Sequence, residues 1–201
     1  MISILIHDHP QDITQEELAH DLLLLPSWRR SQALKYHFLS DQVLCAKAYL
    51  LLCEALRRDY GIAEAPAFDY GAQGKPVLVD YPHIHFNISH TSHGVMCAVS
   101  DRPVGCDIED IPPQLDLDLC RYCFSSQEVE GILTSENPTV AFTRLWTQKE
   151  ALLKLTGEGL NDHLPTLLAT NESRRATFTT VENPARGFVY TVCQYQSDAK
   201  D

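Results

Sequence analysis

Two carboxylates, Asp107 and Glu109, are separated by one residue in the sequence VGCDIE. They alternate with the apolar residues Val104, Cys106 and Ile108, and this period of two predicts a β-strand. Side chains two residues apart share one strand face at a spacing of roughly 7 Å, so the carboxylates repel each other unless a cation lies between them. Oxygen ligands of this kind suit Mg²⁺, although a solvated strand face can have the same pattern.

A second candidate is the sequence WTQKEALLK at residues 146–154, which lacks Gly and Pro and is predicted to be helical. At 100° per residue, Lys149 falls in the middle of the apolar stripe of this helix. Its ammonium group therefore either extends to the surface or meets buried anionic groups. Glu150 and Lys154 are four residues apart, a spacing that also occurs in ordinary surface ion pairs.

Two shorter motifs precede these, GKP at residues 74–76 and FNISH at residues 86–90. Alternating apolar residues predict a strand over 84–89, a second strand over 95–99 and a third over 104–108, with a turn at 101–103. The polar residues at 89–92 lie where the first of these strands is expected to end.

Together, the four motifs resemble the signature of the Sfp-type 4′-phosphopantetheinyl transferases, which combines FNxSH, (V/I)GxD(I/V)E and WxxKEAxxK. The four motifs occur in the order and spacing of that family, over roughly residues 74–160. The resemblance implies transfer of 4′-phosphopantetheine from coenzyme A to a serine of an apo acyl or peptidyl carrier protein. The other product would be adenosine 3′,5′-bisphosphate, and the pathway fatty-acid or secondary-metabolite biosynthesis.

By the same resemblance, Asp107, Glu109 and Glu150 would hold Mg²⁺, or else Mn²⁺. Glu150 would take the proton of the serine, directly or through metal-bound water. Lys154 would stabilise charge on the leaving phosphate or donate a proton to it. Coenzyme A would also contact Lys75, Ser89, His90 and Lys154.

The 3′-phosphate of coenzyme A is bound in the family by basic residues from the N-terminal region. In this sequence Lys47, Arg30 or Lys35 could supply that charge. Gln42 stands where the family has an arginine, so the residues that bind this phosphate stay open.

The resemblance also implies an α+β fold of two similar antiparallel halves, residues 1–101 and 102–201, packed as a pseudodimer. The active site would lie in the cleft between the halves. We expect a monomer, because a fused pseudodimer already buries the surface that two separate halves would share.

Composition limits the other functions. The net charge of −11 argues against nucleic-acid binding, and no apolar run approaches the ~20 residues of a membrane span. The N-terminus lacks the pattern of a signal peptide, and the seven cysteines form no regular framework, so we expect a cytoplasmic protein.

Two alternatives remain open. A metal-dependent hydrolase could use the clustered histidines, His83, His85, His90 and His93, because imidazole groups bind zinc. A non-catalytic relative could bind coenzyme A or a carrier protein without turnover.

Other elements follow from local signals. Capping-box pairs, Thr14 with Glu17 and Ser125 with Glu128, predict two helix starts. Gly61 is a predicted stop for a helix that begins at Ser40 or Asp41. Strands are expected at residues 3–6, 68–70, 164–169, 175–181 and 187–194.

Overall fold

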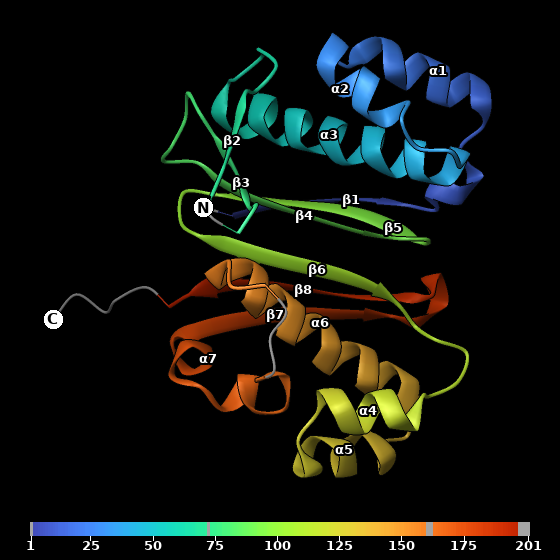
Figure 1. Cartoon of the computed structure of the whole chain (residues 1–201), viewed down its shortest axis with the longest axis vertical. Helices are drawn as coiled ribbons and strands as arrows, with labels where there is room; N and C mark the ends of the chain where they lie inside the picture. Colours follow the sequence, from blue (N-terminus) through green and yellow to red (C-terminus); the bar gives the residue numbers. More distant parts are fainter. Residues whose placement is uncertain (1, 72, 160–162, 197–201) are drawn as a thin grey trace, which may run out of the picture. The chain divides into compact units, whose positions relative to one another are not determined.

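The computed structural model describes residues 2–71, 73–159 and 163–196 of the chain. The chain divides into two compact units, residues 1–101 and residues 102–201 (Figure 1). Both units combine helices with antiparallel strands, so the predicted α+β class is confirmed.

The first unit is built on a three-stranded antiparallel sheet with the strand order β1-β5-β4. Its strands are β1 (Ile2–Asp8), β4 (His85–Thr91) and β5 (Gly94–Ser100). The long helix α3 (Leu39–Tyr60) lies across one face of this sheet (Figure 1). The smaller elements are η1 (Pro10–Asp12), α1 (Gln15–Leu24), α2 (Ser27–Ala33) and the hairpin of β2 (Phe68–Tyr70) with β3 (Pro76–Leu78).

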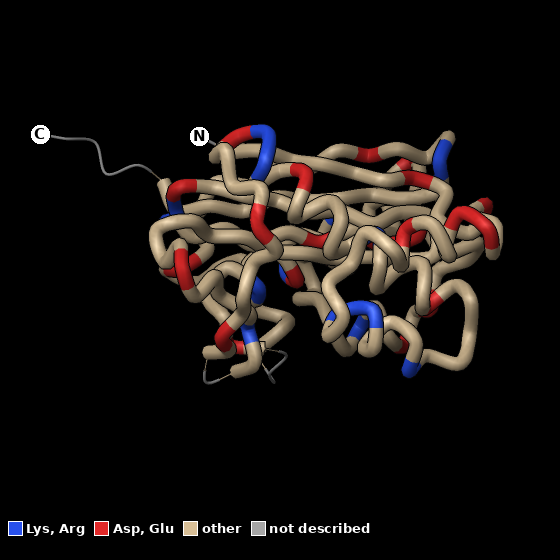
Figure 2. The backbone as a smooth tube through the Cα atoms, turned by 90° about the horizontal axis from the view of Figure 1, so that it is seen from above, with Lys and Arg blue, Asp and Glu red and all other residues tan. Residues whose placement is uncertain are grey.

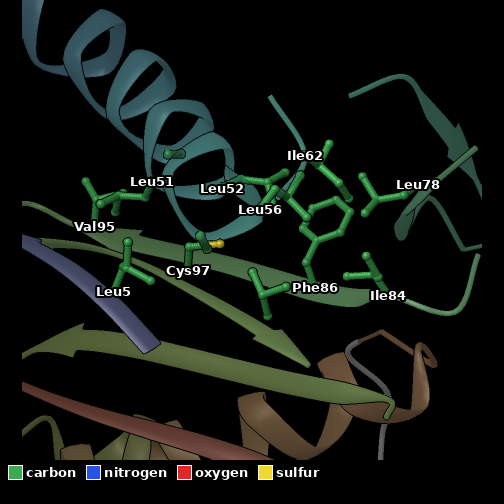
Figure 3. Close-up of a cluster of buried hydrophobic side chains, with 13 residues drawn as sticks. Leu5, Leu51, Leu52, Leu56, Ile62, Leu78, Ile84, Phe86, Val95 and Cys97 are labelled. Carbon is green, nitrogen blue, oxygen red and sulfur yellow. The ribbon is translucent and has the colours of Figure 1, made fainter. Parts of the chain in front are cut away.

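The core of this unit fills the space between α3 and the sheet (Figure 3). Leu52, Ala55 and Leu56 of the helix are fully buried, as are Val95 and Cys97 of β5. The helical side chains recur every three to four residues and the strand side chains every two, so each element presents one apolar face to the other.

The second unit has a three-stranded antiparallel sheet with the order β6-β8-β7. Its strands are β6 (Val104–Asp110), β7 (Ala176–Asn183) and β8 (Phe188–Tyr195), and α6 (Pro138–Thr156) packs against the sheet (Figure 1). The other elements are α4 (Leu117–Cys123), α5 (Ser126–Leu133), η2 (Leu164–Ala169), α7 (Asn171–Arg175) and η3 (Pro184–Arg186). In both three-stranded sheets, the strand that comes third in the sequence lies in the centre, with the first strand on one side and the second on the other. In both units the longest helix follows the first of these strands in the sequence and precedes the second.

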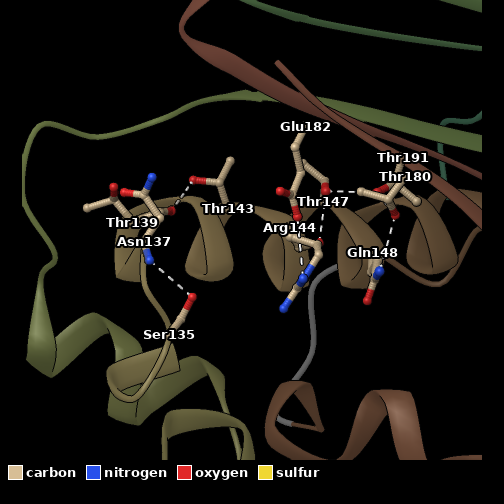
Figure 4. A network of polar contacts seen from close by, with 10 residues as sticks. All are labelled: Ser135, Asn137, Thr139, Thr143, Arg144, Thr147, Gln148, Thr180, Glu182 and Thr191. Carbon is tan, nitrogen blue, oxygen red and sulfur yellow. Dashed lines mark hydrogen bonds and ion pairs between the residues drawn. The ribbon is translucent and has the colours of Figure 1, made fainter. Parts of the chain in front are cut away.

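Polar contacts tie the middle of α6 to the sheet of the second unit (Figure 4). The hydroxyl of Thr191 on β8 bonds Thr147 of α6 at 2.8 Å and Thr180 of β7 at 2.9 Å. Gln148 donates to the hydroxyl of Thr180 at 3.1 Å. Because Thr147 and Thr191 are fully buried, these bonds fix how α6 is turned over the sheet.

Most local predictions are confirmed. Both capping boxes are present, Thr14 with Glu17 and Ser125 with Glu128, and α6 ends at Gly157, which has a φ of 78°. The helix α3 begins at Leu39, one residue before the predicted start, and ends at Gly61.

The strand predicted at residues 164–169 is wrong, because this segment is the 3₁₀ helix η2. Pro165 has no N–H group for a sheet ladder and fixes φ near the helical value. Leu164 and Leu167 are both buried, and their spacing of three residues matches the 3₁₀ period.

Seven cysteines are unpaired, and all except the half-buried Cys53 are buried. Acidic residues outnumber basic ones by 27 to 16, and Figure 2 shows both kinds at many places along the backbone. Within the described residues, every helix is too short or too polar to cross a lipid bilayer.

Candidate functional site

The candidate site of the second unit is built by β6 and α6. Trp146, Glu150 and Lys154 recur every four residues on one side of α6, and Asp107 and Glu109 share a face of β6. Gly105 lies on the same face as these carboxylates. A Cβ atom at position 105 would collide with the backbone of Ala151 and Leu155, so this glycine allows α6 to approach β6.

Asp107 and Lys154 form an ion pair in which Lys154 Nζ lies 2.6 Å from Asp107 Oδ1. The Asp107 side chain is 2% exposed and the Lys154 side chain 30%. Burial by itself lowers the pKa of Lys154, but the charge and hydrogen bond of Asp107 outweigh it and raise that pKa overall. Lys154 is therefore protonated at neutral pH.

Glu109 accepts a hydrogen bond from the indole Nε1 of Trp146 at 3.3 Å. Burial, followed by the negative charge of Asp107, raises the pKa of Glu109 to about 7. Burial and Asp107 also raise the pKa of Glu150. The three carboxyl groups thus interact with one another electrostatically, as the sequence predicts for groups that compete for one cation.

The chemistry of these residues fits a hard divalent ion, since carboxylate oxygens are its preferred ligands. Burial and, after it, the charge of Asp107 raise the pKa of both Glu109 and Glu150, and a bound cation would offset both effects. No three His, Cys, Asp or Glu side chains in the described ranges are already arranged around a common metal position. In this structure Lys154 supplies the positive charge at Asp107.

Lys149 of the same motif lies outside this site. Its side chain is fully buried, and Nζ donates to Glu128 Oε2 at 2.9 Å and to the backbone oxygens of Cys123 and Leu164 at 3.0 and 2.7 Å. The prediction that the Lys149 ammonium meets a buried anionic group, and does not extend to the surface, is confirmed. Lys149 connects α6 to the start of α5, the end of α4 and the start of η2.

The first unit contains a cavity of about 340 Å³ beside α3 and β4. Aromatic side chains contribute much of its wall: Tyr36, Tyr49, Phe68, Tyr70 and Phe86. His90 and Arg29 also line it, and they are the basic groups of the wall.

Sequence reasoning did not single out Arg29 for this cavity. Its guanidinium donates to Gln32 Oε1 and to the Cys45 carbonyl oxygen, both at 3.0 Å, and lies over the ring of Tyr49. Its Nε is buried, and among the described residues nothing accepts a hydrogen bond from it. A signal was available, because Ala33 lies one helical turn after Arg29, and an apolar residue at that spacing favours an inward-facing position for both.

The other predicted coenzyme A residues have different positions. Ser89 precedes His90 on β4, so its side chain points to the opposite face of the sheet, where it is 7% exposed. Lys75 lines a separate cavity of about 210 Å³ together with Pro76 and His85.

The basic residues considered for the 3′-phosphate are mostly engaged in the fold. Lys47 forms an ion pair with Asp21 at 2.7 Å. Arg30 Nε donates to the Leu22 carbonyl at 2.7 Å and thereby caps the end of α1, while Gln42 bonds the Tyr36 carbonyl at 2.8 Å. Lys35 is exposed in the turn after α2.

The four clustered histidines do not converge. His85 and His90 lie on opposite faces of β4, and each lines a different cavity. His83 is exposed in the segment before that strand, and His93 is half-buried in the turn after it. This arrangement does not support the hydrolase alternative.

Comparison with known proteins agrees with the site. A model of the 4′-phosphopantetheinyl transferase superfamily matches residues 103–198. The chain is 34% identical over 167 residues to 4′-phosphopantetheinyl transferase psf-1 of Bacillus pumilus, covering 81% of this chain and 71% of that protein. It is 29% identical over 152 residues to 4′-phosphopantetheinyl transferase Sfp of Bacillus subtilis, covering 74% and 67%.

A third relative, 4′-phosphopantetheinyl transferase HetI of a Nostoc species, is 40% identical over 100 residues, which is 46% of this chain and 42% of that protein. The sequence motifs, the α6–β6 site that they build and these similarities agree, and the chain belongs to the 4′-phosphopantetheinyl transferase superfamily, to its Sfp-type branch.

Proposed function

We propose that this chain transfers 4′-phosphopantetheine from coenzyme A to a serine of an apo acyl or peptidyl carrier protein. The serine Oγ forms a bond to the pantetheine-bearing phosphorus, and the bond from that phosphorus to adenosine 3′,5′-bisphosphate breaks. The observation that carries this proposal is the α6 stripe of Glu150 and Lys154 facing Asp107 and Glu109 of β6, in a chain of this superfamily.

Asp107, Glu109 and Glu150 would hold Mg²⁺ or Mn²⁺, and the ion would supply neutralisation of the pyrophosphate charge. In phosphoryl transfer, positioning and electrostatic stabilisation account for most of the catalysis. The protein needs clustered carboxylates for that purpose more than a covalent nucleophile, and this is what the α6–β6 site contains.

Glu150 is our candidate to accept the serine proton, directly or through a bound water. Burial and Asp107 raise the pKa of Glu150 towards neutral pH, and a general base is most effective when its pKa lies near the working pH. Lys154, whose pKa is raised by Asp107, would keep its proton and stabilise negative charge on the leaving phosphate.

The cavity of the first unit would receive the adenosine end of coenzyme A. Its aromatic wall suits a flat base, and Arg29 offers positive charge to phosphate groups, with the His90 imidazole lining the same cavity. The buried Nε of Arg29 is a donor for which a phosphate oxygen would be a suitable acceptor. We propose Arg29 as the main ligand of the 3′-phosphate, with Lys75 and Ser89 retained as further candidate contacts.

From the family resemblance we further propose that the two units form a monomeric pseudodimer with the active site in the cleft between them. The shared strand order supports two similar halves. A cytoplasmic location remains our expectation.

Intact-protein mass spectrometry tests the reaction. An apo carrier protein is incubated with this chain, coenzyme A and Mg²⁺, with and without EDTA. We expect a mass gain of one phosphopantetheine group that EDTA prevents and that Glu150→Gln reduces at least about 100-fold. Glu130→Gln, an exposed carboxylate on α5, is the matched control and should transfer at the wild-type rate.

Three outcomes separate the alternatives. No mass gain with several unrelated carriers, despite coenzyme A binding, would indicate the non-catalytic relative. Neither gain nor binding would refute the proposal. Full transfer in EDTA would refute the metal role of the three carboxylates.

A further inference from the structure

We propose that Trp146 is a positioning residue, whose indole N–H holds the Glu109 carboxylate in the orientation that binds the divalent ion. This inference rests on the proposed function, because it assigns Glu109 to the metal. Trp146 itself need not touch the ion or coenzyme A.

The first support is the hydrogen bond from Trp146 Nε1 to Glu109 Oε1, at 3.3 Å. Trp146 lies one helical turn before Glu150 and two before Lys154, on the same side of α6. The helix therefore supplies a hydrogen-bond donor for each of the two carboxylates that face it from β6, Trp146 for Glu109 and Lys154 for Asp107.

The second support is that the indole ring is itself held in place. Trp146 packs edge-on against Phe124, with ring centroids 6.5 Å apart, and Phe124 packs against Phe142 at 5.4 Å. The buried ammonium of Lys149 lies over the ring of Phe124 at 4.6 Å. These contacts connect the buried ion pair of Lys149 with Glu128 to the indole and from there to Glu109.

The two donors act differently on their carboxylates. Lys154 is a cation and neutralises Asp107, whereas the indole N–H is neutral and leaves the charge of Glu109 intact. A glutamate has three side-chain torsions, and fixing them before the ion arrives removes an entropic cost of binding. Groups that orient metal ligands in this way typically contribute 10- to 100-fold to metal affinity.

The test is the Mn²⁺ affinity of the full chain, measured from the electron paramagnetic resonance signal of free Mn²⁺. Titrations are run with and without coenzyme A, and the signal of coenzyme A alone is subtracted. We expect Trp146→Phe to bind Mn²⁺ at least about 10-fold more weakly than the wild type. Trp28→Phe, at the other tryptophan of the chain, should leave the affinity unchanged.

Phe124→Leu removes the edge contact and keeps the indole N–H. We expect it to weaken Mn²⁺ binding less than Trp146→Phe does, and it replaces that variant if Trp146→Phe fails to fold. In the Trp28→Phe protein, whose remaining tryptophan is Trp146, bound Mn²⁺ should quench the fluorescence. Circular dichroism confirms that each variant is folded.

The outcomes for Trp146 and for the reaction are separable. Equal Mn²⁺ affinity of Trp146→Phe and the wild type would overturn the role of Trp146, while transfer by the wild type would still support the proposed function. A wild type that transfers phosphopantetheine in Mg²⁺ but binds no Mn²⁺ would also overturn it. A wild type that neither transfers nor binds Mn²⁺ would refute both proposals.

Discussion

Arg29 and Arg30 are neighbours in the chain but have different surroundings. Arg29 lines the cavity beside His90, whereas Arg30 donates to the carbonyl oxygens of Leu22, Leu23 and Leu25 at the end of α1. A ligand role and a structural role can therefore be compared between adjacent residues of the same type.

We expect Arg29→Gln to raise the KM for coenzyme A about 10-fold or more, because a charge-assisted hydrogen bond contributes roughly 1.5–3 kcal/mol. Arg30→Gln should lower the thermal unfolding temperature and leave this KM nearly unchanged. Steady-state kinetics with coenzyme A and with dephospho-coenzyme A measures the KM of each variant, and thermal unfolding measures its stability. If Arg29 binds the 3′-phosphate, the variant and the wild type should differ little with dephospho-coenzyme A; an equal loss with both donors would contradict the assignment.

His7 of β1 predicts a pH dependence of stability. Its Nε2 is buried without a hydrogen bond in the described part of the chain, and burial, then Lys47, lowers its pKa below 6.5. Below pH 6.5 the unfolded chain therefore binds a proton at His7 that the folded chain does not, so this residue lowers the free energy of unfolding as the pH decreases. We expect the free energy of unfolding, measured in urea, to decrease less between about pH 7.5 and pH 5.5 in His7→Leu than in the wild type. An identical decrease in the two proteins would exclude His7 as the source of the pH dependence.

At the scale of elements, the approach of α6 to β6 depends on Gly105. A methyl group there would meet backbone atoms of Ala151 and Leu155, including the Leu155 nitrogen at 2.5 Å, and backbone cannot move aside as a side-chain tip can. The helix would have to shift, and Glu150 and Lys154 would shift with it.

We expect Gly105→Ala to destabilise the protein by about 2–3 kcal/mol and to lower kcat. Gly131→Ala is the matched control, because Gly131 is exposed in α5 with no atom within 4 Å of an added Cβ. It should raise stability by about 0.5–1 kcal/mol through helix propensity and leave kcat unchanged. Chemical denaturation and transfer rates would contradict this account if the two variants behaved alike.

Lys149 and Glu128 form an ion pair between α6 and α5 that is coupled to the capping box of Ser125. Lys149→Met leaves the Glu128 charge half-buried without its cation, at a cost of about 2–4 kcal/mol. Adding Glu128→Gln removes that charge while keeping a side chain that can complete the capping box. The double variant should therefore be more stable than Lys149→Met in urea unfolding; additive losses would mean that the pair is not coupled.

Elements whose boundaries carry local chemistry could be predicted from the sequence, as α1 and α5 show through Thr14 and Ser125. The placement of Asp107 and Glu109 on one face of a strand could also be predicted, because it follows from the period of two alone. The segment at η2 could not, because its buried Leu164 and Leu167 are set by packing against a core that local sequence does not reveal. Arg29 was missed for the same reason, since a cavity wall gathers residues that are distant in sequence.

At the scale of the whole molecule, net charge governs how a partner approaches. The chain carries a formal charge of −11, and an acidic carrier protein would be repelled at long range. Raising the ionic strength reduces the distance over which this repulsion acts, because the Debye length falls from about 30 Å at 0.01 M to about 8 Å at 0.15 M.

We therefore expect kcat/KM for an acidic carrier protein to rise between about 0.01 and 0.15 M salt, with kcat at saturating carrier nearly constant. Transfer rates at several carrier concentrations measure both quantities. A fall in kcat/KM over this range would instead indicate a locally basic docking surface that dominates the encounter.

The buried thiols give the molecule built-in reporters of local opening. Cys45 and Cys97 are buried in the first unit, and Cys106, Cys120, Cys123 and Cys193 in the second. A thiol-reactive reagent applied to the folded protein should modify Cys53 first, and slowly, because burial raises the pKa of that thiol. Each later modification records an excursion that uncovers one unit, so peptide mapping over time can compare the opening rates of the two units in the unaltered chain.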